Sequence, residues 1–239
     1  MAAKKVKKVK KVIVKNTIRD KSKDYRTLKQ VVPRSYAQED YLTSIEDNIV
    51  TFGIGPAGTG KTYLAVYMAL AALWGKKHSG VNKIVLTRPV VEAGEKLGFL
   101  PGGIDEKLDP YMRPLYDAMH DVIGIEATND KVSKGVIEIA PVAYMRGRTF
   151  HDCFIILDEA QNCSYDQIKM VLTRLGENST LVICGDGDQT DLSGESGLLQ
   201  ISQKLVNVNN IGISTFTSKN VERSEIVGSI LEALANANN

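Results

Sequence analysis

Short apolar runs rich in β-branched residues alternate along the chain with longer segments in which apolar positions recur at helical spacing. The apolar runs predict buried strands at residues 49–54, 83–87, 136–139, 153–157, 181–184 and 211–216. The longer segments predict helices at residues 61–74, 108–123, 164–175, 197–205 and 221–235. Strands and helices that alternate in this way build a mostly parallel sheet with helices on both faces. The pattern therefore predicts an α/β fold.

The composition narrows the class of protein. The chain has 239 residues, of which 43% are hydrophobic and 24% charged, and these values exclude fibrous and largely disordered proteins. Its longest apolar run, residues 63–74, is too short for a membrane span, so we expect no membrane partner. The three cysteines include no CxxC pair, which predicts reduced, buried thiols in a cytoplasmic protein.

The charge is divided unevenly between the N-terminus and the rest of the chain. Residues 1–23 carry ten Lys and Arg against one acid, whereas the remainder holds 20 basic and 27 acidic side chains. We expect residues 1–32 to form a basic, flexible tail and residues 33–239 to form the folded domain. Such a tail is typical of a solvated leader, of an electrostatic contact to nucleic acid, or of a contact to an anionic membrane surface.

A glycine-rich motif links the first predicted strand to the first predicted helix. It reads Gly55-Pro56-Ala57-Gly58-Thr59-Gly60-Lys61-Thr62 and matches GxxxxGK[ST]. Gly58 and Gly60 lack Cβ atoms, so the backbone can direct its N–H groups toward phosphate oxygens, beside the partial positive charge of the helix N-terminus. Lys61 is expected to bridge the β- and γ-phosphates of a nucleotide, and Thr62 to hold Mg²⁺ through its hydroxyl.

Two acids follow the predicted strand at residues 153–157. Asp158 is expected to reach the carboxyl edge of the sheet and to support Mg²⁺ there. Glu159 is expected to accept a proton from an attacking water. The next predicted strand leads into a segment rich in Gly and Asp that contains Gln189. Either Gln189 senses the γ-phosphate or orients the water, or the segment is an ordinary turn.

The order of these motifs resembles the first core domain of superfamily 1 helicases, and residues 33–235 are similar to the PhoH-like family of P-loop ATPases. The resemblance rests on residues 53–65, 86–102, 109–118, 136–141, 143–149 and 156–162. It implies a RecA-like P-loop NTPase fold that binds ATP and Mg²⁺. It also implies that Gln38 reads the adenine, that Thr87-Arg88-Pro89 touches nucleic acid or relays the nucleotide state, and that copies assemble as a hexameric ring.

The chain departs from the family pattern at two places. The run Asn220-Val221-Glu222-Arg223-Ser224 keeps the family's arginine but not its neighbours, and Asp188 stands where the family has Thr. A single core domain also lacks the arginine that a second domain would direct at the γ-phosphate. We expect a neighbouring copy to donate one in trans, with Arg223 as the first candidate and Arg146 or Arg148 next. The alternative for each of them is a surface ion pair.

Together these motifs predict a Mg²⁺-dependent ATPase of the PhoH-like type, coupled to the binding or unwinding of RNA or single-stranded DNA. The alternative is a nucleotide-gated assembly protein without motor activity. A small-molecule P-loop kinase is a further alternative, but it would need a second substrate pocket and an arginine-rich lid.

Overall fold

A computed structural model describes residues 28–29, 31–75, 80–90, 104–187 and 196–221 of the chain, and for residues 104–109 the backbone alone. The strands are β1 (Val50–Ile54), β2 (Lys83–Arg88), β3 (Ile137–Pro141), β4 (Cys153–Leu157), β5 (Thr180–Gly185) and β6 (Ile211–Thr215). The α-helices are α1 (Tyr36–Asp47), α2 (Lys61–Trp74), α3 (Ile104–Ile123), α4 (Ile125–Ser133), α5 (Tyr165–Leu172) and α6 (Gly197–Leu205). Short 3₁₀ turns are η3 (Val142–Met145), η4 (Ala160–Asn162) and η5 (Ser218–Asn220).

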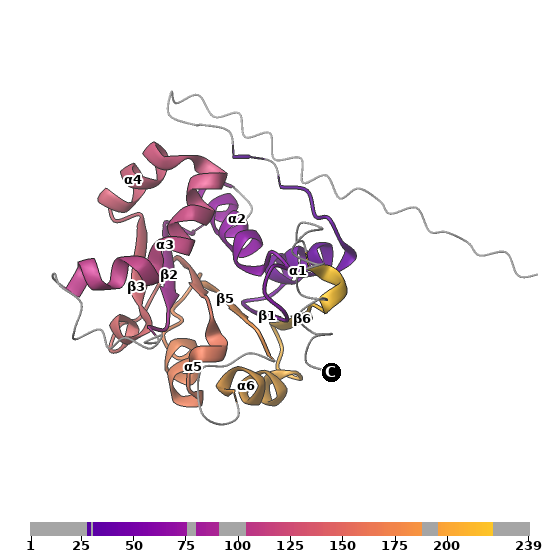
Figure 1. The fold of residues 1–239 in the computed structure, drawn as a ribbon. Helices are drawn as coiled ribbons and strands as arrows, with labels where there is room; N and C mark the ends of the chain where they lie inside the picture. The colour runs from indigo at the N-terminus through magenta and orange to yellow at the C-terminus, as the bar shows by residue number, and fades with distance from the viewer. Residues whose placement is uncertain (1–27, 30, 76–79, 91–103, 188–195, 222–239) are drawn as a thin grey trace, which may run out of the picture.

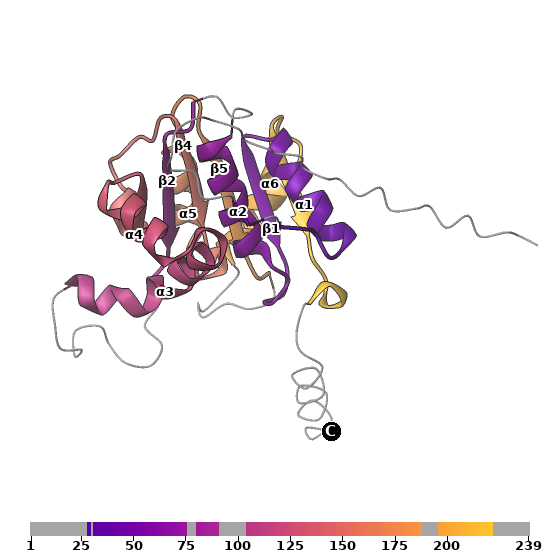
Figure 2. The same cartoon turned by 90° about the horizontal axis from the view of Figure 1, so that it is seen from above.

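The six described strands form one sheet in the order β3-β2-β4-β5-β1-β6, and all of the strand pairs in it are parallel. Helices cover both faces of the sheet. In Figure 1, α1 to α4 lie above the sheet and α5 and α6 below it, and Figure 2 shows the first group in front of the strands and the second behind. The α/β fold with a mostly parallel sheet and helices on both faces is thus confirmed.

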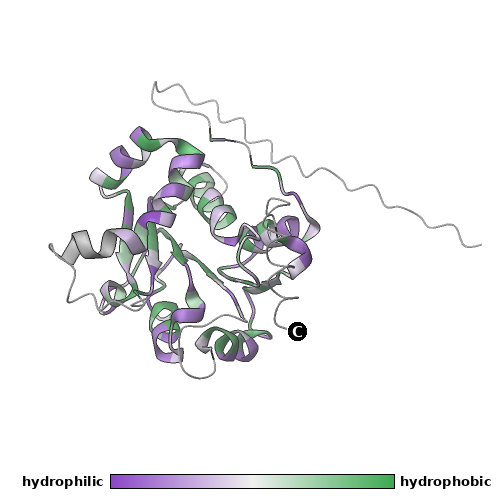
Figure 3. Ribbon diagram, in the orientation of Figure 1, coloured by the Kyte–Doolittle hydropathy of each residue, from purple (hydrophilic) through white to green (hydrophobic). Residues whose placement is uncertain are grey.

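Alternate residues of the central strands pack into two separate cores. On β4, Phe154 and Ile156 face the core under α1, α2 and α3, whereas Ile155 and Leu157 face the core under α5 and α6. All four side chains are fully buried. The apolar colour is accordingly concentrated on the strands in Figure 3, whereas the helices alternate between apolar and polar residues. A strand that is buried on both faces has a continuous apolar run in its sequence, which explains why the strand predicted at residues 153–157 coincides with β4.

Each predicted strand lies within two residues of an observed one, but the helices were predicted less completely. Helix α3 starts four residues earlier than expected, α5 is shorter, and α1 and α4 were not predicted. Helix α1 begins at the N-cap Ser35, and its buried residues are Gln38, Tyr41 and Ile45. Because the polar Gln38 is buried while Tyr36 is 81% exposed, the buried face of this helix is not a regular apolar pattern. The helix predicted at residues 221–235 falls, after its first residue, outside the described residues.

Four strands end at one edge of the sheet and bring their following residues together there. Strand β1 leads into the loop of residues 55–60, β2 ends in Arg88, β4 leads into Asp158, and β5 into Asp186. The carboxyl edge of a parallel sheet is where α/β folds bind ligands. Thr87 is in register with Leu157, so Arg88 lies beside Asp158. A helix long and apolar enough to traverse a membrane is not found in the described part of the chain.

Candidate functional site

The loop of residues 55–60 has the backbone shape of a phosphate cradle. Gly55, Gly58 and Gly60 all have positive φ angles, of 149°, 81° and 84°. These conformations suit residues without a side chain, and they turn consecutive N–H groups toward one point. At Gly55 there is also no room for one, since an added Cβ would lie 2.3 Å from the carbonyl oxygen of Phe216. The last glycine is the N-cap of α2, so the helix N-terminus faces the same point.

Lys61 folds its side chain back over this loop. Its Nζ donates to the carbonyl oxygens of Gly55 at 2.6 Å and Pro56 at 2.8 Å, and to the Thr59 hydroxyl at 3.3 Å. The side chain is buried, and burial lowers the pKa of its ammonium group. Neutral carbonyls are weaker partners for an ammonium than phosphate oxygens are. The loop therefore holds the ammonium group of Lys61 at the place where a phosphate would be bound.

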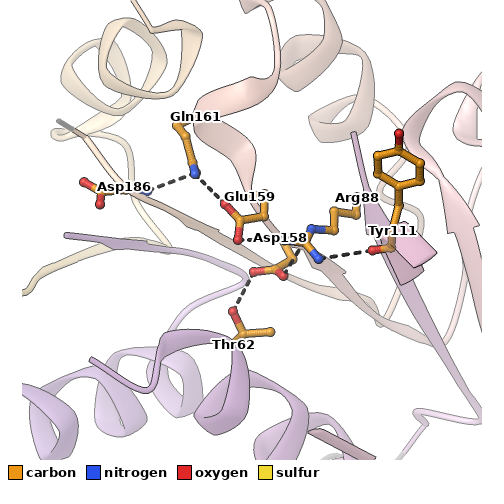
Figure 4. Close-up of polar contacts among 7 residues, drawn as sticks. All are labelled: Thr62, Arg88, Tyr111, Asp158, Glu159, Gln161 and Asp186. Atoms are coloured by element: carbon orange, nitrogen blue, oxygen red, sulfur yellow. Dashed lines mark hydrogen bonds and ion pairs between the residues drawn. The ribbon is translucent and has the colours of Figure 1, made fainter. Parts of the chain in front are cut away.

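Thr62 and Asp158 face each other across the end of the sheet. The Thr62 hydroxyl donates to Asp158 Oδ1 at 2.6 Å, as Figure 4 shows. Asp158 is 4% exposed, and burial is the main cause of a raised pKa at its carboxyl group. A hydroxyl and a buried carboxylate are hard oxygen ligands, which Mg²⁺ prefers. A divalent cation beside Asp158 would offset the cost of burying its charge, so the pair fits such an ion.

These two residues do not make a complete metal site. Over the part of the chain that the structure describes, no group of three His, Cys, Asp or Glu side chains is placed to hold a metal ion. A cation at Thr62 and Asp158 would thus take its other ligands from water and from a nucleotide, as Mg²⁺ usually does in phosphate-binding sites.

Glu159 is held from two sides. Its backbone adopts the left-handed conformation, with φ 52°, which is uncommon for a residue with a side chain. Its Oε1 accepts from Arg88 Nη2 at 2.8 Å, and its Oε2 accepts from Gln161 Nε2 at 2.5 Å. Gln161 in turn accepts the backbone N–H of Asp186 at 3.0 Å (Figure 4).

All of these groups border one cavity of about 400 Å³. Its lining comprises Ala57, Gly58, Gly60, Lys61, Thr62, Tyr63, Arg88, Pro114, Ala118, Asp158, Glu159, Gln161, Gly185 and Asp186. The structure therefore brings together Lys61, Thr62, Asp158 and Glu159, which the sequence singled out separately. The cavity is within the usual range for a small-molecule site.

Gln38 lies on a second cavity of about 460 Å³, which shares Gly58, Gly60 and Tyr63 with the first. Its Nε2 donates to the carbonyl oxygen of Thr59 at 3.1 Å, and its Oε1 accepts from the Arg34 N–H at 2.8 Å. Gln38 therefore braces the loop. A primary amide has two N–H groups and two lone pairs, so one of each is left by these two bonds. That Gln38 reads the adenine stays a prediction.

Of the remaining predicted residues, the structure describes Arg146 and Arg148, and neither lines this cavity. Gln189 and Arg223 lie outside the described residues. Arg148 is engaged within its own chain, because both of its terminal nitrogens contact the carboxylate of Glu138, which disfavours it as an arginine donated to a neighbour. Arg146 follows η3 and is exposed.

Three residues of the hydrogen-bond network around Glu159 were not predicted in that role. They are Arg88, Gln161 and Asp186. Arg88 carried a signal, since it directly follows the predicted strand at residues 83–87. Only the order of the strands shows that this strand runs beside the one that leads to Asp158 and Glu159.

Comparisons with known proteins agree on one family. The family model described as PhoH-like protein matches residues 30–235. The PhoH-like protein of Mycobacterium tuberculosis H37Rv is 51% identical over 209 residues, which are 87% of this chain and 58% of that protein. The PhoH-like protein of Bacillus subtilis 168 is 50% identical over 207 residues, 86% of this chain and 64% of that protein.

A more distant relative is Protein PhoH of Escherichia coli K12, which is 42% identical over 216 residues, 89% of this chain and 60% of that protein. The chain thus spans less than two thirds of the length of these curated relatives. Among solved structures, the Pyrococcus furiosus Hef helicase domain matches with a TM-score of 0.46 and 14% identity, over 77% of this chain and 38% of that one. The Candida albicans Pif1 helicase matches with a TM-score of 0.39 and 14% identity, over 78% and 40%.

Proposed function

Because this chain belongs to the PhoH-like protein family, we propose that it is an ATPase, which binds ATP with Mg²⁺ and hydrolyses it. The observation that carries this proposal is the contact between Thr62 and Asp158, made beside Lys61 and Glu159 on one cavity. A P-loop NTPase needs a phosphate cradle, a cation site and a base within reach of each other, and these four residues supply the side chains for all three.

Each residue has a distinct task in this proposal. The loop N–H groups and the ammonium of Lys61 hold the negative charge of the phosphates. Thr62 and Asp158 hold Mg²⁺, which neutralises the charge that develops as the terminal phosphoryl group is transferred. Glu159, next to Asp158 and 37% exposed at its side chain, orients the attacking water and accepts its proton.

Turnover and nucleotide binding test the proposal when they are measured separately. We expect Glu159→Gln to lower ATP turnover by about 10²–10⁴-fold and to leave nucleotide binding intact, because the amide keeps the shape but cannot accept the proton. Lys61→Ala should weaken nucleotide binding itself. Lys134→Ala, on the exposed end of α4, controls for the loss of one positive charge. Wild-type turnover in Glu159→Gln, or no binding of ATP by the wild type, would contradict the proposal.

We further propose that hydrolysis is coupled to RNA or single-stranded DNA. The support is the Lys-rich segment at residues 1–23 and the resemblance to helicase core domains. ATP turnover measured with and without each nucleic acid tests this coupling. Stimulation together with salt-sensitive binding is the expected result. No binding at low salt and no stimulation would favour the alternative, a nucleotide-gated assembly protein without motor activity.

We also propose a homo-oligomer, in the form of a hexameric ring, in which a neighbouring copy donates the arginine that completes the site. Arg223 and the exposed Arg146 are the candidates. A copy with Arg223 or Arg146 replaced by Ala still has an intact nucleotide site, and a copy with Glu159→Gln can still donate its arginine to a neighbour. Mixing two such inactive variants should therefore restore about a quarter of wild-type turnover if copies assemble at random. A mixture that stays inactive for both arginines, or a monomer in sedimentation, would contradict donation in trans.

A further inference from the structure

Arg88 connects the acid pair to helix α3. Its Nη2 donates to Glu159 Oε1 at 2.8 Å, and its Nη1 donates to the carbonyl oxygen of Tyr111 at 3.1 Å. Its Nε lies 3.9 Å from Asp158 Oδ2. The three nitrogens of one rigid, planar guanidinium group therefore face three different partners. Figure 4 shows Arg88 lying between Tyr111 and the two acids.

The opposite side of Glu159 is connected to the end of β5. Gln161 donates to Glu159 Oε2 and accepts from the Asp186 N–H. An added Cβ at Gly185 would lie 2.9 Å from Gln161 Oε1, so the amide is packed closely against the end of β5. The carboxylate is thus fixed at one oxygen from β2 and at the other from β5. A carboxylate with both oxygens hydrogen-bonded has a defined orientation, which a base that orients water requires.

Helix α3 borders this cavity and contacts Arg88. Its residues Pro114 and Ala118 line the cavity beside Lys61 and Thr62. The helix contains Pro110 and Pro114, and each proline removes a backbone hydrogen bond from the helix interior. Tyr111, whose carbonyl accepts from Arg88, lies between these two prolines. Arg88 therefore contacts α3 in a segment where prolines remove two backbone hydrogen bonds of the helix.

We propose that Arg88 is a positioning residue, which orients Glu159 for hydrolysis and couples the nucleotide site to α3. This inference rests on the proposed role of Glu159 as the base. In this proposal Arg88 lines the cavity but acts through Glu159 rather than on the reacting groups. Its loss should consequently affect turnover more than nucleotide affinity, and the effect should disappear when Glu159 can no longer act as a base.

A double-mutant cycle tests the first half of the inference. We expect Arg88→Ala to lower kcat by about 10–100-fold while KM changes by less than about threefold. Arg88→Lys should recover part of this loss, since one ammonium cannot reproduce all contacts of a guanidinium. Arg88→Ala combined with Glu159→Gln should be no slower than Glu159→Gln alone. Additive losses, or a raised KM with unchanged kcat, would overturn the positioning role. Arg88→Gln serves in the same cycle if the alanine variant does not fold.

Hydrogen exchange tests the coupling to α3 without using turnover. Adding Mg²⁺ and a non-hydrolysable ATP analogue to the wild type should change exchange at residues 111–121. This response should be lost in Arg88→Ala and kept in Lys134→Ala. An equal response in Arg88→Ala, or no response in the wild type, would overturn the coupling. A wild type that does not hydrolyse ATP would instead contradict the proposed function, and the exchange result would still decide whether Arg88 links the site to α3.

Discussion

At the scale of single residues, the cost of building this site falls on Asp158. Its carboxylate is removed from water at the end of β4, and the groups that donate to it, the hydroxyl of Thr62 and the backbone N–H of Glu159, are both neutral. The guanidinium of Arg88 is 3.9 Å away and is shared with Glu159. A buried charge without full compensation destabilises the folded chain, and the raised pKa of Asp158 expresses this cost. Under the proposed binding of Mg²⁺, a cation at Thr62 and Asp158 would offset this cost.

The effect of Asp158→Asn on thermal stability should have opposite signs without ligand and with Mg²⁺ and nucleotide. Without ligand, the amide removes the buried charge and keeps the shape, so we expect a gain of about 1 kcal/mol, or about 2–4 °C in melting temperature. The stabilisation that Mg²⁺ and nucleotide give the wild type should be lost in this variant. Thermal unfolding with Mg²⁺ and nucleotide, and again in chelator, measures both effects. A variant less stable than the wild type in chelator would contradict this account.

The environment of Glu138 lowers the pKa of its carboxyl group and so makes the stability of the fold depend on pH. It lies on β3 and contacts Lys83 at 2.7 Å and Arg148 at 2.8 Å, and the hydrogen bond from Arg148 is the main cause of a pKa lowered to about 2. A lowered pKa in the folded state stabilises the fold above the ordinary pKa of 4.5, and this contribution is lost as pH falls toward 2.

Glu138→Gln should therefore destabilise the protein at pH 7 by about 1 kcal/mol, a value reduced for the partial exposure of the group. The difference between wild type and variant should shrink as pH falls from about 4.5 to about 2. Denaturant unfolding at a series of pH values measures this difference. A constant difference down to pH 2 would show that the charge of Glu138 is not responsible.

At the scale of elements, the features that sequence patterns predicted are those that depend on a short stretch of the chain. The apolar strands, the glycine loop and the acids after β4 each lie within a few neighbouring residues of the chain. Contacts between elements were not predictable in the same way. Arg88 meets Glu159 because β2 pairs with β4, whose residues lie about 70 positions further along. Gln161 meets the Asp186 N–H for the same kind of reason.

The missed helices have a local explanation. Helix α1 buries a polar residue, Gln38, together with Tyr41 and Ile45, so its buried face mixes polar and apolar residues. In α4, Thr128 is the buried residue, and Ile125 is 61% exposed. A helix is recognised in a sequence by its apolar face, and in both of these helices a polar residue is buried on that face. Helix α3 contains two prolines, which normally mark a boundary rather than an interior.

At the junction between β1 and the loop of residues 55–60, the chain has no room for a side chain. Gly55 has a φ of 149° and lies against Phe216, whose carbonyl oxygen would be 2.3 Å from an added Cβ. Gly55→Ala should destabilise the fold by about 3 kcal/mol or more, because both the conformation and the contact are lost.

Gly147→Ala is the matched control for that variant. Gly147 has a φ of 77°, and no described atom lies within 4 Å of an added Cβ. Its cost should be limited to about 1 kcal/mol of backbone strain. Equal losses for the two variants in denaturant unfolding would show that the contact with Phe216 does not constrain the loop.

At the scale of the whole molecule, positive charge and nucleotide chemistry belong to different parts of the chain. Residues 1–23 hold ten of the 30 Lys and Arg, whereas the remainder has an excess of acids. The cations at the cavity, Lys61 and Arg88, are engaged by the loop and by the acid pair. If hydrolysis is coupled to a nucleic acid as proposed, the N-terminal segment is the part of the chain whose charge would attract it.

Removing residues 1–27 should weaken binding of RNA or single-stranded DNA at least about tenfold at low salt and flatten the dependence of affinity on salt. ATP turnover without nucleic acid should stay the same. The deletion stops before Leu28 and Val31, because both pack against the core. A variant with the lysines of this segment replaced by glutamine keeps its length and should behave like the deletion. Unchanged affinity in both would place the nucleic-acid contact elsewhere.

The position of β1 in the sheet has a consequence for synthesis of the protein. This strand carries the glycine loop, yet its neighbours are β5 and β6, whose paired residues begin at Leu181 and Ile211. While the ribosome is still making the middle of the chain, β5 and β6 do not yet exist. Strand β1 is then unpaired, and its apolar side chains are not covered by the complete sheet. If the loop after β1 binds ATP as proposed, a nascent chain would complete that site only after β5 and β6 have been made, so binding would follow folding rather than guide its start.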